Sequence, residues 1–273
     1  MEALRQVDEW PAGRAVVGVT KAREALATHG DAGSQFEWAS VTKLVTALTV
    51  LVASEEGTID LDDSAGPPGS TVRHLLAHAS GLPADAGAPI AEPGSRRIYS
   101  NAGFEVLADT VAERAAIAFS DYLRQAVLEP LGLEATLVGS PASGIRGSGD
   151  DLLALGRELL APTLLAPETL TEATVPAFPG LVGVLPGYGR MEPNDWGLGF
   201  ELRDDKRPHW TGQLNSPRTF GHFGQSGSFL WVDPEAGLAC ACLSDEPFGE
   251  WAKAAWPRLA DAVLAELAPA APN

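Results

Sequence analysis

The 273-residue sequence is poor in cysteine, in basic residues and in long apolar runs. Its two cysteines are Cys240 and Cys242, which alternate residues of a strand would place on one face. Strand geometry disfavours a disulfide between such neighbours. No histidine and cysteine cluster with metal-ligand spacing accompanies them, so we expect neither a metal nor another cofactor. We predict two buried thiols in a reduced protein.

Basic residues are few: 19 Lys and Arg stand against 36 Asp and Glu, which gives a formal net charge of -17. An acidic surface disfavours nucleic acid and anionic membranes as partners. The ordinary consequence of such a charge is solubility, and we prefer it to a role in recognition.

Long apolar stretches are missing, because the longest run, residues 44–53, is far too short to span a membrane. Residues 1–8 show no basic segment followed by an apolar one, so no signal peptide is expected. We therefore expect a cytoplasmic protein, or a secreted or periplasmic one if a leader has been removed. The 45% hydrophobic content suffices for one large domain or two closely packed ones.

The most informative stretch is residues 38–43, Trp-Ala-Ser-Val-Thr-Lys, and the apolar run that follows it. Apolar residues recur at helical spacing from Val41 to Val52, which predicts a helix that ends at residues 55–57. Ser40 at its start and Lys43 three residues later would share one face. A neutral lysine can take the proton of such a serine, and helix N–H groups favour nearby negative charge. The alternative is an ordinary helix start followed by a surface lysine.

The remaining pattern predicts strands at both ends and helices between them. The expected strands are 15–20 and 24–28, joined as a hairpin, and 198–202, 228–232 and 238–243, with a glycine-rich segment at 220–227 and a turn at 233–237. The expected helices are about 71–80, 103–118, 121–127, 150–160, 167–173 and 251–267. Residues 174–195 are rich in Pro and Gly and too long for an ordinary connector, so we expect them to border a site.

His74 and His78 lie one helical turn apart, a spacing that can bind zinc. No glutamate lies between them in the metalloprotease pattern, and no third ligand is evident. We expect their imidazoles to tie the end of this helix to neighbouring loops.

Three motifs stand in order along the chain: Ser-x-x-Lys at 40–43, Tyr-Ser-Asn at 99–101 and His-Phe-Gly at 222–224. With the stretch 78–83, His-Ala-Ser-Gly-Leu-Pro, they resemble the serine β-lactamase and penicillin-binding-protein superfamily. Tyr-x-Asn in second place resembles the branch of class C β-lactamases, DD-carboxypeptidases and family VIII esterases. The resemblance spans about residues 14–266.

This resemblance implies an α+β fold, in which an antiparallel sheet is flanked by helices and a mostly helical region is inserted. Residues 1–65 and 196–273 would form the sheet subdomain and residues 66–195 the helical one. The active site would lie in the cleft between them.

The same resemblance implies roles for single residues. Ser40 would be the nucleophile, Lys43 its proton acceptor and Tyr99 a phenol or phenolate in the proton relay that protonates the leaving group. Asn101 would donate to the carbonyl of the acyl substituent. The alternatives are a core tyrosine at 99 and a helix N-cap at 101, before Gly103.

Gly224 would let the strand edge approach the substrate. The N–H groups of Ser40 and Gln225 would form an oxyanion hole, in which a single donor can be worth ~3 kcal/mol. His222 and Phe223 stand where β-lactamases usually carry lysine and threonine. A histidine is largely neutral near pH 7 unless its pKa is raised, so we expect weaker holding of a substrate carboxylate.

We therefore predict a serine hydrolase that acts through an acyl-enzyme on a small ester or amide. One alternative is a true β-lactamase or DD-carboxypeptidase, with a β-lactam or a peptide as substrate. Another is a penicillin-binding or sensing protein without turnover.

Overall fold

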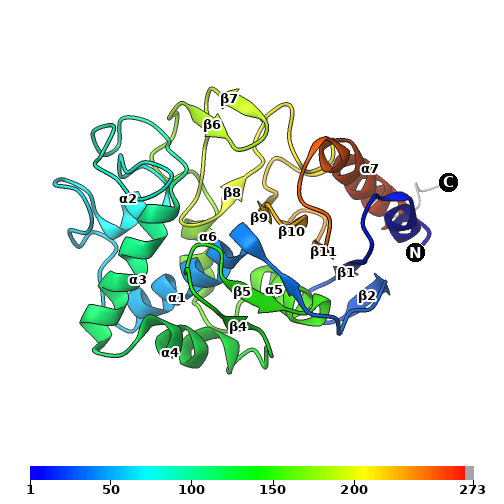
Figure 1. Cartoon of the computed structure of the whole chain (residues 1–273), viewed down its shortest axis with the longest axis horizontal. Helices are drawn as coiled ribbons and strands as arrows, with labels where there is room; N and C mark the ends of the chain where they lie inside the picture. The colour runs from blue at the N-terminus through cyan, green and yellow to red at the C-terminus, as the bar shows by residue number, and fades with distance from the viewer. Residues whose placement is uncertain (268–273) are drawn as a thin grey trace.

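The centre of the molecule is a six-stranded antiparallel sheet, seen in a computed structural model that describes residues 1–267 (Figure 1). Its strand order is β2-β1-β11-β10-β9-β8. The strands are β1 (Ala15–Thr20), β2 (Ala25–His29), β8 (Glu201–Leu202), β9 (Phe220–Gly224), β10 (Ser228–Asp233) and β11 (Leu238–Ser244). The N-terminal hairpin joins the C-terminal strands through β1 and β11, where Val17 lies opposite Cys242. The predicted α+β fold is confirmed.

The two faces of this sheet carry different helices. Helix α7 (Glu250–Leu267) and the 3₁₀ helix η1 (Ala3–Glu9) cover one face, and α5 (Gly149–Leu160) covers the other. Successive residues of β11 therefore alternate between two apolar environments. Cys240 and Cys242 point toward the α7 side, where both are free and buried, as predicted.

A helical region lies beside the sheet and is built around α1 (Thr42–Glu55) (Figure 1). It also contains α2 (Val72–Leu76), α3 (Asn101–Ala115), α4 (Phe119–Leu123) with the π turn Arg124–Leu128, and α6 (Pro167–Ala173). Helix α1 contacts α3 and α4 and is buried along residues 42–53, polar ones included. The hydroxyl of Thr46 donates to the carbonyl of Pro141 at 2.6 Å, so this polar group is satisfied inside the core.

The elements of the two expected subdomains are interleaved. Helix α5 belongs by number to 66–195, yet it packs on β1, β10 and β11, and α1 contacts α3. One apolar core runs through both regions. The division at 1–65, 66–195 and 196–273 stays a prediction.

Short strands account for most differences from the expected elements. A three-stranded sheet joins β3 (Phe36–Glu37), β5 (Ile145–Gly147) and β4 (Thr136–Leu137), and a hairpin joins β6 (Gly183–Leu185) to β7 (Gly189–Met191). Strand β8 covers only the end of 198–202, α2 is shorter than 71–80, and β9 occupies the glycine-rich segment. Strands of two or three residues are too short to show a period of two in the sequence. Within residues 1–267, no helix has both the length and the apolarity to cross a membrane.

A substitution at Gly199 would test how closely the loop before β8 packs on α1. Its φ is +88°, and a Cβ there would lie 2.2 Å from the Cβ of Ala47. Gly57 is a matched control, because its φ is +73° and a Cβ there meets nothing within 4 Å. We expect Gly57→Ala to lower the free energy of unfolding by roughly 1 to 2 kcal/mol, the cost of a left-handed conformation. Gly199→Ala should cost roughly 1 to 3 kcal/mol more, the added cost of overpacking.

Urea denaturation of both variants, followed by circular dichroism, measures the difference. Equal losses in the two variants would contradict the tight contact between this loop and α1.

Candidate active site

The Ser40 side chain is presented by a tight bend between β3 and α1. Ser40 lies in the 3₁₀ turn η2 (Ala39–Val41), so α1 begins two residues after it rather than at it. Ala39 has φ +44°, a left-handed conformation that is uncommon outside glycine. The carbonyl of Trp38 accepts from the N–H of Val41 at 3.1 Å and from the hydroxyl of Ser228 at 2.7 Å. Strained residues of this kind cluster at functional sites when the surroundings hold them in place.

Lys43 is fully buried beneath this bend, so the alternative of a surface lysine is wrong. Its Nζ lies 3.5 Å from Ser40 Oγ and donates to Asn101 Oδ1 at 2.7 Å and to the carbonyl of Ala142 at 2.9 Å. Burial lowers the pKa of Lys43 to about 7, although the carboxylate of Glu105 acts in the opposite direction. A large share of this amine is therefore neutral at physiological pH.

Tyr99 lies immediately before α3 and faces the same amine. Its ring centroid is 4.7 Å from Lys43 Nζ. Burial raises the pKa of the Tyr99 phenol, while a hydrogen bond with Ser40 acts in the opposite direction. The side chain is therefore a phenol at neutral pH rather than a phenolate. It is half-buried and lines the cavity described below, unlike an ordinary core tyrosine.

Asn101 is the first residue of α3, and it is not the helix cap. Ser100 is the N-cap, because its Oγ accepts from the N–H of Gly103 at 3.0 Å. This corrects the alternative that placed the cap at 101. The Asn101 amide instead accepts from Lys43 and directs its Nδ2 toward Asp85 Oδ1, 3.4 Å away.

His78 holds the second motif in place. Its Nδ1 accepts from the N–H of Ser100 at 3.1 Å, and its backbone has φ +54°. His74 contacts the hydroxyl of Thr71 through Nδ1 at 2.9 Å. The prediction that these imidazoles tie the helix end to neighbouring loops is confirmed for His78, whereas the hydrogen bond of His74 stays at the N-cap of its own helix. No group of three or more His, Cys, Asp or Glu residues suited to a metal occurs in residues 1–267.

The third motif lies on β9 and carries no charge. His222 Nδ1 donates to the carbonyl of Phe223 at 2.6 Å, which leaves Nε2 as an acceptor without a partner in the described part of the chain. Burial, reinforced by the charge of Lys43, lowers the pKa of His222 to about 3. The imidazole is therefore neutral near pH 7, as the sequence suggested.

Gly224 brings the end of β9 against the bend that carries Ser40. A Cβ at this position would lie 2.4 Å from Ser228 Oγ and 2.5 Å from the carbonyl of Trp38. The close approach is thus to the backbone beside Ser40. Gln225 follows directly, and its side-chain amide donates to the carbonyl of Phe248 at 3.2 Å. The oxyanion role of the two backbone N–H groups stays a prediction.

A cavity of about 210 Å³ gathers most of these residues. It is lined by Ser40, Tyr99, Asn101, Leu185, Pro186, Trp196, Glu201, His222, Phe223 and Gln225. Lys43 and Gly224 are not among the lining residues, but Lys43 contacts Ser40 and Gly224 directly precedes Gln225. Leu185 and Pro186 come from the long segment 174–195, which was expected to border a site.

Sequence reasoning missed two residues of this cavity, Trp196 and Glu201. The ring centroid of Trp196 lies 5.8 Å from that of Tyr99 and 5.5 Å from that of His222. Both missed residues are 1% exposed. A single acidic residue inside the apolar stretch 198–202 was the available signal for Glu201.

The Glu201 carboxylate is held ionised by its partners. Oε1 pairs with Lys206, while Oε2 accepts from His209 Nε2 at 2.8 Å and from Trp210 Nε1 at 2.9 Å. Burial opposes ionisation, but His209 and Lys206 outweigh it and lower the pKa of Glu201 to about 2. The pair with Lys206 balances this charge inside the protein, so the cavity wall is polar without a net charge from the pair.

With this geometry, the class of protein can be stated. A family model described as Beta-lactamase matches residues 11–265, and the chain belongs to that family, whose members are typically serine hydrolases.

Two solved structures resemble this chain over nearly its whole length. A β-lactamase from Mycobacterium bovis, solved as a crystal structure, is 51% identical with a TM-score of 0.96 and covers 98% of this chain and 100% of its own. EstCE1, described as a hydrolase with promiscuous acyltransferase activity, shares the fold with a TM-score of 0.80 at 18% identity, over 96% of this chain and 97% of its own.

Curated relatives match over shorter stretches. Penicillin-binding protein 4* of Bacillus subtilis is 29% identical over 138 residues, which are 38% of this chain and 31% of that protein. The D-alanyl-D-alanine-carboxypeptidase/endopeptidase AmpH of Escherichia coli is 27% identical over 135 residues, 36% of this chain and 35% of that protein. The match thus spans about a third of each.

The neutral state of His222 can be measured directly. Because its pKa lies at about 3 in the folded protein against an ordinary 6.5, its imidazole should stay uncharged down to pH 5. Nuclear magnetic resonance of the imidazole nitrogens, compared with the urea-denatured protein, tests this. Between pH 6.5 and about 3, His222 is protonated in the unfolded state but not in the folded state. Its contribution to the free energy of unfolding is therefore present above pH 6.5 and is lost as the pH falls toward 3. Titration of the folded resonance between pH 6 and 7 would contradict the assignment.

Proposed function

We propose that this protein is a serine hydrolase that acts through an acyl-enzyme on a small ester or amide. The observation that supports it best is the pair of Ser40 and Lys43. Their reacting atoms lie 3.5 Å apart, and burial lowers the pKa of the amine to about 7. A neutral amine at that distance can accept the serine proton, whereas an ordinary lysine would remain protonated.

In the first half of the reaction, Lys43 takes the proton of Ser40 as Oγ attacks the substrate carbonyl. Negative charge develops on the carbonyl oxygen, where the N–H groups of Ser40 and Gln225 are proposed to donate. Tyr99 then gives its phenolic proton to the leaving group and regains a proton from Lys43. The Tyr99 pKa is raised, which favours a proton donor over a base.

In the second half, water attacks the acyl-enzyme and the same groups move the protons in reverse. Asn101 positions the Lys43 amine through Oδ1 and offers Nδ2 on its other side. This arrangement supports its role as a donor to the acyl substituent.

The neutral third motif favours esters over β-lactams. β-Lactams carry a carboxylate that is best held by a cation at this motif. Here the position holds an imidazole with a pKa of about 3, followed by Phe223, which has no hydroxyl. Simple esters require no such cation.

A second candidate is a β-lactamase, because the Mycobacterium bovis relative that carries this description is 51% identical along nearly the whole chain. In this case, binding would depend on neutral hydrogen bonds at the third motif. The ratio of ester to β-lactam turnover separates the two candidates.

We expect the unmodified protein at pH 8 to hydrolyse p-nitrophenyl butyrate with a higher kcat/KM than nitrocefin. Ser40→Ala should abolish both activities and the mass increase of an acyl-enzyme, because it removes the attacking oxygen. The matched control is Ser120→Ala, at an exposed serine on α4, which should leave both unchanged.

Spectrophotometric rates and intact-protein mass spectrometry provide the measurements, with circular dichroism to verify folding. Faster turnover of nitrocefin than of the ester would promote the β-lactamase. A stable adduct without turnover would indicate a penicillin-binding or sensing protein, and activity in folded Ser40→Ala would refute the nucleophile.

The pKa of Lys43 predicts a pH dependence. Because the lysine must be neutral to accept a proton, kcat/KM for p-nitrophenyl butyrate should fall about tenfold per unit below the pKa of about 7 and level off above it. Lys43→Arg replaces the amine with a permanently charged guanidinium and should lower kcat by roughly 10²-fold or more, the size of a lost general base. A flat profile from pH 5.5 to 8.5 in a protein that stays folded would exclude this base.

A further inference from the structure

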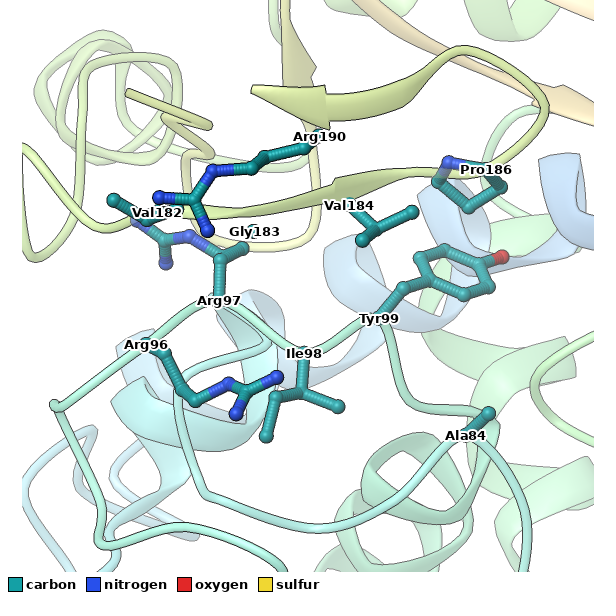
Figure 2. Close-up of a pocket in the computed structure, with 10 residues that line it drawn as sticks. All are labelled: Ala84, Arg96, Arg97, Ile98, Tyr99, Val182, Gly183, Val184, Pro186 and Arg190. Carbon is teal, nitrogen blue, oxygen red and sulfur yellow. The ribbon is translucent and has the colours of Figure 1, made fainter. Parts of the chain in front are cut away.

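A second cavity, of about 560 Å³, adjoins the one that contains Ser40 (Figure 2). The two cavities share Tyr99 and Pro186. One wall is the segment 96–99 that leads into α3, and the other is the β6–β7 hairpin with residue 182 before it. No residue of the third motif lines it.

The two walls are joined by the Arg97 backbone and side chain. Its N–H donates to the carbonyl of Val182 at 2.9 Å, and the residue pairs with Gly183. The guanidinium is buried and donates to backbone carbonyls, among them those of Asn194 at 3.1 Å and Ala177 at 2.8 Å. Arg97 therefore joins the two walls of the cavity. Its guanidinium donates to backbone carbonyls, so we do not assign it to a ligand.

The positive charges of two other arginines, Arg96 and Arg190, are available to bind a ligand. Arg96 is exposed and makes no ion pair within the described residues, and Arg190 pairs only with exposed Glu192 at 2.9 Å. Exposed pairs of this kind are weak and easily exchanged. In Figure 2, Arg96 and Arg190 both lie on the side of the cavity away from the Tyr99 ring and Pro186, with segment 96–98 between their guanidiniums in this view.

Ile98 and Val184 form an apolar surface between the arginines and the Tyr99 ring, and Val182 lies beside the arginines (Figure 2). No acidic side chain is among the residues that line the cavity, although the protein has 36 acidic residues and a net charge of -17. A cavity with an apolar surface next to Tyr99 and two arginines on its far side fits a ligand of matching polarity.

We propose that this cavity binds the leaving-group side of the substrate, as an apolar segment that ends in a carboxylate or phosphate. The assignment to the leaving group rests on the function proposed above, in which Tyr99 protonates that group. The Tyr99 ring forms the shared wall, and its hydroxyl points away from the arginines (Figure 2). Asn101, the proposed contact of the acyl substituent, lines the Ser40 cavity and not this one.

This site differs in place from the one that holds a carboxylate in the related lactamases. Their cation belongs to the third motif, whereas here the arginines lie beyond Tyr99. The anion must therefore be separated from the reacting carbonyl by the length of the apolar stretch. Compact β-lactams do not provide such a spacing, but the esters of a longer acidic alcohol or phenol do.

The test compares three butyrate esters whose leaving groups are 4-hydroxybenzoate, its neutral methyl ester and 4-hydroxyphenyl phosphate. The double variant Arg96→Gln, Arg190→Gln should lower kcat/KM for an anionic ester tenfold or more, mainly through KM. The neutral ester should change less than twofold. Intrinsic leaving-group reactivity cancels, because each substrate is compared between variant and unmodified protein.

Arg258→Gln, at an exposed arginine on α7, is the matched control and should change none of the rates. A loss with only one of the two anions supports the site and identifies the anion. Equal losses with the neutral ester, or no loss with either anion, would overturn the proposal. A fourth substrate, p-nitrophenyl hydrogen succinate, carries its anion on the acyl side. A loss of activity confined to this substrate would overturn the assignment of the cavity to the leaving group.

A binding measurement tests the anion cavity independently of the proposed hydrolase activity. Calorimetry with 4-hydroxybenzoate and 4-hydroxyphenyl phosphate, on unmodified protein and on the double variant, requires no turnover. If no ester is hydrolysed yet binding of either anion weakens tenfold in the variant, the hydrolase fails and the anion cavity stands. If neither compound binds the unmodified protein, the cavity assignment fails.

Discussion

The burial of one amine, that of Lys43, is the constraint on which the site depends. A fully buried lysine loses the hydration of its charge, so its environment must either supply acceptors or lower its pKa, and here it does both. The acceptors come from segments far apart in the chain: Asn101 begins α3, and Ala142 lies in the loop before β5. The amine thus contacts the bend that carries Ser40, the second motif and the loop near 142. The amine therefore stabilises the contacts between these segments as well as lying next to Ser40.

The sheet supplies the rigid side of the cavity. Strand β9 lies against the bend that carries Ser40 because residue 224 has no side chain, and the hydroxyl of Ser228 donates to the carbonyl of Trp38. The left-handed backbone of Ala39 is held between this contact and the start of α1. Site residues placed on strands and helix starts are held more firmly than residues on free loops.

The charged and neutral groups of the site and of the adjoining cavity lie in separate places. The third motif carries a neutral imidazole, the carboxylate of Glu201 is balanced by Lys206, and the available arginines lie beyond Tyr99. In a protein with a net charge of -17, the adjoining cavity has two exposed arginines and no acidic residue in its lining. Under the proposed assignment, selectivity would come from the far end of the substrate rather than from the group beside the reacting bond.

The sequence by itself determined whatever depends on neighbours along the chain: the helix that carries Lys43 one turn from Ser40, the terminal hairpins and the alternation that buries Cys240 and Cys242. Local periodicity and ordered motifs are sufficient for these features. Only the tertiary structure decided that Lys43 is buried and that Trp196 and Glu201 line the Ser40 cavity. It also decided that Arg96 and Arg190 line the adjoining cavity. These features arise from contacts between residues tens to hundreds of positions apart, and burial and pKa shifts depend on such contacts rather than on residue type.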